Sequence, residues 1–165
     1  MAVVTGAHQH DASPPKLRHR WPGVTNLPEI NVALFAFLLN LPWELWQIPL
    51  FKGMPSLSHW EGVIQCTRAA LGDAAIALAA FWLVAALART RGWMRRPSAA
   101  TIGAFVAIGL IVTVALEYWA TRLGGRWEYD EAMPRLPLLG TGLTPLLQWL
   151  LIPPLVAWLV RRQIP

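Results

Sequence analysis

The sequence predicts an all-α integral membrane protein, a polytopic four-helix bundle with both termini in the cytoplasm. The chain of 165 residues is 55% hydrophobic and only 14% charged, which is outside the usual range for a soluble domain. It contains four mostly apolar segments of roughly 20 residues or more, each long enough to cross about 30 Å of hydrocarbon. Its basic residues lie in clusters between these segments, where they indicate membrane orientation rather than nucleic-acid binding.

Residues 1–27 form a polar arm rich in proline and histidine, which we expect to be flexible. The arm lacks the apolar core and cleavage site of a signal peptide. Residues 28–162 are predicted to form a single transmembrane domain. Cys66 is the only cysteine, so an internal disulfide is impossible, and no motif spacing indicates a metal site or a cofactor. We therefore expect neither a bound metal ion nor a cofactor.

The four predicted spans cover residues 28–51, 66–88, 99–120 and 136–160. The first is the most polar, and the second and third are rich in alanine, leucine and valine. The fourth contains Pro145 and the pair Pro153–Pro154, so we expect it to be kinked or broken within the membrane.

Lysines and arginines are distributed unequally over the two sides of these spans, with nine on one side and five on the other. The connection from Arg89 to Arg96 contains four arginines and no acid. The positive-inside rule therefore places this side, and both termini, in the cytoplasm. We expect a multi-pass protein of a cell membrane, the inner membrane in a Gram-negative bacterium, that contacts membrane lipids and binds no nucleic acid.

Three of the acidic residues inside the predicted spans lie at a similar depth. Glu44, Asp73 and Glu117 belong to different spans, yet each falls in the outer third of the membrane. Glu117 also continues a stripe with Gly109 and Thr113. An ionisable group at this depth costs at least about 2.5 kcal/mol and normally faces the bundle interior, a partner or a water-filled cavity. We predict the three acids to be catalytic residues of one site; the alternative is that they only join helices.

Polar and aromatic side chains at a similar depth complete the predicted site. Asn40, Glu44 and Gln47 share one face of the first span. Arg68 and Arg126 are expected to be counter-ions of the acids. The connector after the third span is expected to form a cap over the site. The predicted substrate-binding residues are Asn40, Gln47, Arg68, Trp119, Arg126, Trp127, Tyr129 and Gln148.

The C-terminal third resembles small membrane carotenoid hydratases and lycopene-cyclase-like proteins. The features that carry this resemblance are Glu117, the Gly-x-x-x-Tyr stretch from Gly125 to Tyr129, the Leu-Pro-Leu of residues 136–138 and Trp149. Those families modify isoprenoids by acid–base chemistry within the membrane, and the resemblance implies an acid–base role for Glu117. The chain is shorter than the proteins of those families and lacks the paired-acid signature of the cyclases.

Three functions fit these observations. The first is an enzyme for an apolar isoprenoid or lipid substrate, in which carboxylic acids donate protons and aromatic faces stabilise a carbocation. The second is a proton-coupled transporter using Glu44 and Asp73, which with so few spans would need to form a homo-oligomer. The third is a non-catalytic subunit of a membrane complex.

Overall fold

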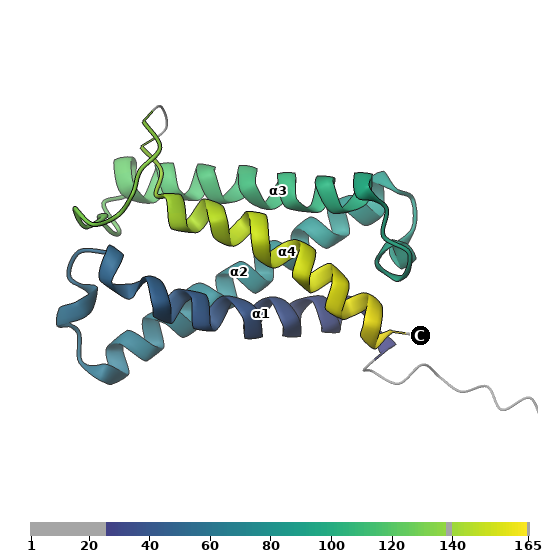
Figure 1. Cartoon of the computed structure of the whole chain (residues 1–165), viewed down its shortest axis with the longest axis horizontal. Helices are drawn as coiled ribbons and strands as arrows, with labels where there is room; N and C mark the ends of the chain where they lie inside the picture. The colour runs from purple at the N-terminus through teal and green to yellow at the C-terminus, as the bar shows by residue number, and fades with distance from the viewer. Residues whose placement is uncertain (1–25, 138–139, 165) are drawn as a thin grey trace, which may run out of the picture.

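Figure 1 shows the computed structural model, which describes residues 26–137 and 140–164. This part of the chain is all-helical and contains no strand. The long helices are α1 (Pro28–Gln47), α2 (His59–Leu87), α3 (Ala99–Tyr118) and α4 (Leu143–Gln163). The short ones are η2 (Ile48–Leu50), η3 (Met54–Ser56), η4 (Arg91–Arg95) and a π-helical extension of α3, η5 (Trp119–Leu123). Nearly all of the predicted N-terminal arm lies outside the described residues, and so does Leu138.

The four long helices alternate in direction (Figure 1). The start of α1, the α2–α3 connection and the end of α4 lie at one end of the bundle, which we call the arginine end. The α1–α2 and α3–α4 connections lie at the other, which we call the capped end. Helix α1 packs against α2 and α4, and α3 packs against the same two helices. The predicted four-helix architecture is therefore confirmed.

Three of the helical segments are long and apolar enough to cross a membrane: α2, α4, and α3 together with η5. Only 17% of the most apolar window of the α3–η5 segment is buried inside the bundle, against 56% of that of α4. Segment α3–η5 therefore turns most of its apolar surface outward, as a lipid-facing helix does. Helix α1 is not among these segments, so its crossing of the membrane stays a prediction.

Helix α2 begins at His59, earlier than the predicted start at residue 66. Ser58 and Glu61 form a capping box there, in which each side chain accepts a hydrogen bond from the backbone of the other residue. Because the first turns of α2 are polar, the sequence alone predicts a connector in this part of the helix. Helix α3 begins at Ala99 as predicted, after a second capping box.

Helix α4 begins at Leu143, so the predicted start at residue 136 is wrong. The residues before it form a turn, in which Leu136 N donates to Thr141 O at 3.0 Å. Pro145 lies in the first helical turn, where a missing N–H breaks no helical hydrogen bond. The helix continues through Pro153–Pro154. The predicted break is therefore wrong, while a kink stays a prediction.

Tight contacts fix α3 against its neighbours. A Cβ atom at Gly109 of α3 would clash with the ring of Trp149 on α4, so this close approach requires glycine. Towards the arginine end, the ring of Trp93 lies 5.7 Å from that of Phe81 and 5.6 Å from that of Phe105. Trp93 Nε1 donates to the carbonyl of Phe81 at 3.2 Å. An apolar core thus holds this half of the bundle together.

Candidate functional site

Four side chains from three helices form a hydrogen-bonded group, which we call the acid–amide cluster: Asn40, Glu44, Asp73 and Gln148. Gln148 Nε2 is its centre. It lies 2.7 Å from Asn40 Oδ1, 3.0 Å from Glu44 Oε1 and 2.9 Å from Asp73 Oδ2. Asn40 and Gln148 are buried, and the two acids are half-buried. The cluster therefore joins α1, α2 and α4 in the bundle interior.

Local sequence explains how these side chains meet. Asn40 and Glu44 are one helical turn apart and face the same neighbours. Asn40 Nδ2 donates to the carbonyl of Ala36 at 2.8 Å, which fixes the orientation of its amide. On α2, Asp73 lies among small buried residues, Ala70, Ala74 and Ala77, that allow α1 to approach closely.

The cluster has more acceptors than hydrogens. The amide of Gln148 carries two hydrogens but faces three oxygen acceptors. Gln148 thus bridges the carboxyl groups of Glu44 and Asp73. Neither acid forms an ion pair with any residue in the described ranges. The arrangement is a polar network that joins three helices.

Glu117 on α3 accepts two hydrogen bonds from the connector that follows. Its Oε2 accepts one from the Tyr129 hydroxyl and one from Trp127 Nε1, the latter at 3.4 Å. Burial, and next the charge of Glu117, raise the pKa of Tyr129, so this phenol keeps its proton at neutral pH. Glu117 is also close enough to act electrostatically on Glu44 and Asp73. The structure therefore brings the three predicted acids together.

The two connections at the capped end hold Tyr129 over Glu117. Phe51 and Tyr129 form an antiparallel bridge, and their ring centroids are 5.6 Å apart. Lys52 N donates to the carbonyl of Glu128 at 2.9 Å, and Lys52 Nζ lies 2.9 Å from Glu128 Oε2. The α3–α4 connector thus forms a structured cap, as the sequence predicts.

Other predicted site residues lie elsewhere. Arg68 and Arg126 are exposed, and neither pairs with an acid within the described residues, so the counter-ion prediction is wrong. The guanidinium of Arg126 lies 5.7 Å from the ring centroid of Trp119, which is 46% exposed. Long arginine side chains reach the bundle surface, where water or lipid headgroups solvate them. Gln47 is buried, but its Oε1 has no hydrogen-bond partner in the described part of the chain.

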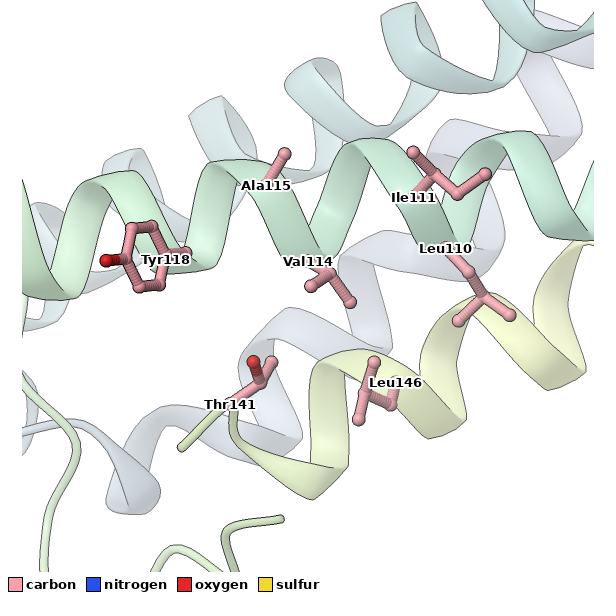
Figure 2. A pocket seen from close by; sticks show the side chains of 7 residues that line it. All are labelled: Leu110, Ile111, Val114, Ala115, Tyr118, Thr141 and Leu146. Carbon is pink, nitrogen blue, oxygen red and sulfur yellow. The ribbon is translucent and has the colours of Figure 1, made fainter. Parts of the chain in front are cut away.

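An apolar groove of about 510 Å³ runs between α3 and the start of α4 (Figure 2). It is lined by Leu110, Ile111, Val114, Ala115, Tyr118, Thr141 and Leu146. Figure 2 shows Tyr118 and Thr141 near one end of it. Their chain neighbours, Glu117 and Gly142, both lie against Tyr129. The groove is thus lined by the chain neighbours of Glu117 and Gly142, while Glu117 and Tyr129 are not among its lining residues.

Comparison of the chain with protein-family models, curated proteins and solved structures finds no match. Function is therefore argued from the site itself. Within residues 26–137 and 140–164, no group of three or more histidine, cysteine and acidic side chains could hold a metal ion. The site offers carboxyl groups, amides, a phenol and an apolar surface.

Sequence reasoning missed the groove and the central position of Gln148. The groove depends on the spacing of α3 and α4, for which Gly109 is the only local signal in the sequence. Gln148 was expected to reach the site as one of several polar residues. Its position five residues before Pro153 carries no sign that three other helical residues converge on it.

Proposed function

We propose that this chain is a multi-pass membrane enzyme that carries out acid–base chemistry on an apolar substrate of the isoprenoid or lipid class. One observation carries the proposal. Three carboxyl groups from three helices interact in one interior, without a cationic partner among the described residues, next to an apolar groove. The positive-inside rule supports a cytoplasmic position for the arginine end.

The groove gives the substrate a route from the bilayer to the acids. Ile111 and Tyr118 line it and are 69% and 55% exposed, so the groove opens to the bundle surface, where lipid would lie. A hydrocarbon chain between α3 and α4 would end beside Tyr129 and Glu117. This geometry suits a long, apolar substrate with its reactive bond at one end.

Proton transfer is the chemistry that these groups can perform. In its protonated form, Glu117 would donate its proton to a carbon–carbon double bond, and the ring faces of Tyr118 and Trp127 would stabilise the resulting carbocation. Loss of a neighbouring proton would give an isomer, and would give a ring if a second double bond of the substrate first attacked the carbocation. Addition of water followed by loss of its proton would give an alcohol. In either case one proton returns to the carboxylate of Glu117. The acid–amide cluster would hold further protons nearby, and the resemblance to carotenoid-modifying proteins around Glu117 supports the same class of reaction.

Mass spectrometry of apolar metabolites tests this proposal. Cells expressing the wild type are compared with cells expressing Glu44→Gln, Asp73→Asn or Glu117→Gln at equal membrane levels. Glu131→Gln is the matched control, because Glu131 is an exposed acid of the cap. A new isoprenoid product with the wild type and the control, but with none of the three variants, supports the enzyme. Normal product from all three variants contradicts it.

A proton-coupled transporter is the second candidate. A void of about 10 Å³ beside the cluster favours it, because its lining includes Asn40 and Gln148 and continues along the bundle to Pro153 and Val156. The void is at the lower limit of the space that one water molecule needs. Solute uptake driven by a pH gradient in proteoliposomes, lost in Asp73→Asn, would support transport. No flux across a broad panel of solutes would count against it.

A further inference from the structure

The arginine end carries six exposed arginines: Arg89, Arg91, Arg95, Arg96, Arg161 and Arg162. They come from the α2–α3 connection and from the last turn of α4, two segments that contact each other. The one acid at this end within the described residues is Glu29, whose Oε1 lies 2.6 Å from Arg91. The remaining five guanidinium groups have no carboxylate partner in the described part of the chain.

Two tryptophans support arginines of this patch. Arg91 lies over the ring of Trp82 at 4.8 Å, and Arg162 lies over that of Trp158 at 4.4 Å. Both rings are exposed, at 42% and 48%. Tryptophan is enriched where hydrocarbon meets the headgroups. Arg91 donates from its edge to Glu29, whereas the stacked guanidinium group of Arg162 keeps its N–H groups available for an oxyanion at the same depth.

Arg89 occupies a backbone conformation that favours glycine, because its φ is 53°. It ends α2 in a Schellman motif, in which Thr90 N donates to Ala85 O at 3.0 Å and Arg89 N donates to Ala86 O at 3.2 Å. Glycine would end this helix with less strain. The helix end therefore does not explain the arginine, whereas a requirement for positive charge at this place does.

We propose that the arginine end binds the phosphate headgroup of an anionic phospholipid. Guanidinium groups match phosphate oxygens in bidentate geometry, and the excess positive charge favours anionic over zwitterionic headgroups. Arg95 and Arg96 form the centre of the site, since they lie just before the N-terminus of α3, whose dipole also favours an anion. The outward apolar surface of α3 adjoins them and suits the acyl chains. This proposal is independent of the proposed enzymatic function.

Native mass spectrometry of the full chain in mild detergent tests the site. Phosphatidylglycerol is titrated against phosphatidylcholine, and we expect the wild type to retain phosphatidylglycerol in preference. Removal of one arginine should weaken this binding about fivefold. The double variant Arg95→Gln with Arg96→Gln should weaken it by that factor for each of the two arginines. The matched control, Arg68→Gln with Arg126→Gln, removes two exposed arginines that lie outside the patch and should leave the binding unchanged.

A second variant separates lipid binding from folding. We expect Arg89→Gly to weaken phosphatidylglycerol binding about fivefold while leaving the thermal midpoint in detergent unchanged or higher. Unchanged lipid binding in Arg89→Gly and in the Arg95–Arg96 double variant would overturn the proposal. The proposal would also be overturned if the wild type retained both lipids equally, or if the control variant lost phosphatidylglycerol binding to the same extent. An equal rise of the thermal midpoint with inorganic phosphate alone would overturn it as well.

Discussion

The interiors of the two halves of the bundle are held together by opposite kinds of contact. Towards the arginine end the interior is apolar, built on Phe81, Trp93 and Phe105, and the charges lie on the rim. Towards the capped end the interior contains the acid–amide cluster, while aromatic rings such as Trp60 are exposed. A buried polar network contributes little net stability compared with apolar packing of the same volume. The comparison indicates that the first half contributes most of the stability, and we propose that the second half contains the functional site.

The largest effect on stability should come from the apolar half. Trp93→Ala removes a buried ring together with its hydrogen bond to Phe81, and should cost about 3–5 kcal/mol of unfolding free energy. Unfolding by sodium dodecyl sulfate in mixed micelles, followed by circular dichroism, measures this cost. The control is Trp60→Ala, which truncates a ring that is 72% exposed. A similar loss in both variants would remove the distinction between the two halves.

A smaller effect on stability, but a complete loss of function, is expected at Gln148. Gln148→Leu keeps most of the side-chain volume and removes the donor shared by Asn40, Glu44 and Asp73. Hydrogen bonds between membrane helices contribute about 1 kcal/mol, so unfolding should change by about that amount.

The same unfolding titration, combined with the product assay, measures both consequences. Gln163→Leu is the matched control, because it makes the same chemical change at an exposed residue in the last turn of α4. A loss of stability in Gln148→Leu as large as that of Trp93→Ala would show that the cluster is structural. Unchanged product formation would separate Gln148 from the function.

The smallest effect should come from the exposed ion pair that joins the two connections at the capped end. The pair consists of Lys52 and Glu128. The hydrogen bond between them, and next the opposite charge of the partner, raise the pKa of Lys52 and lower the pKa of Glu128. The stabilisation is therefore full between the ordinary pKa values of the two groups. It is lost in acid as Glu128 protonates, and in strong base as Lys52 loses its proton.

Melting of Lys52→Gln beside the wild type, at neutral and at strongly acid pH, tests this sign. We expect a small difference near neutrality that disappears in acid and in high salt. A difference that grows in acid would mean that Lys52 acts through some other contact.

The sequence predicts the helices well because hydrophobicity and length constrain them directly. The four helices and the convergence of Glu44, Asp73 and Glu117 follow from span length and from the cost of charge at depth. Helix ends are harder to predict, because they depend on local hydrogen bonds. The Ser58 cap places the start of α2 among polar residues, and α4 begins only after a backbone hydrogen bond at Thr141.

Side-chain partners are less predictable than depth. Arg68 and Arg126 share a predicted side of the membrane with the acids, yet Arg68 lies on an exposed face of α2 and Arg126 in the exposed connector after η5. Charge and depth alone do not decide which way a side chain points. The outer aromatic residues show the same limit, since Trp127 reaches Glu117 while Trp119 lies under Arg126.

The contact between Gly109 and Trp149 controls the width of a groove that neither residue lines. Gly109 does not line the groove, but its missing side chain sets how closely α3 and α4 approach beside Leu110. A single added methyl group would push the two helices apart and alter the width of the groove along its length. A substitution at a residue that does not line the groove could thus change its width without altering the residues of the acid–amide cluster.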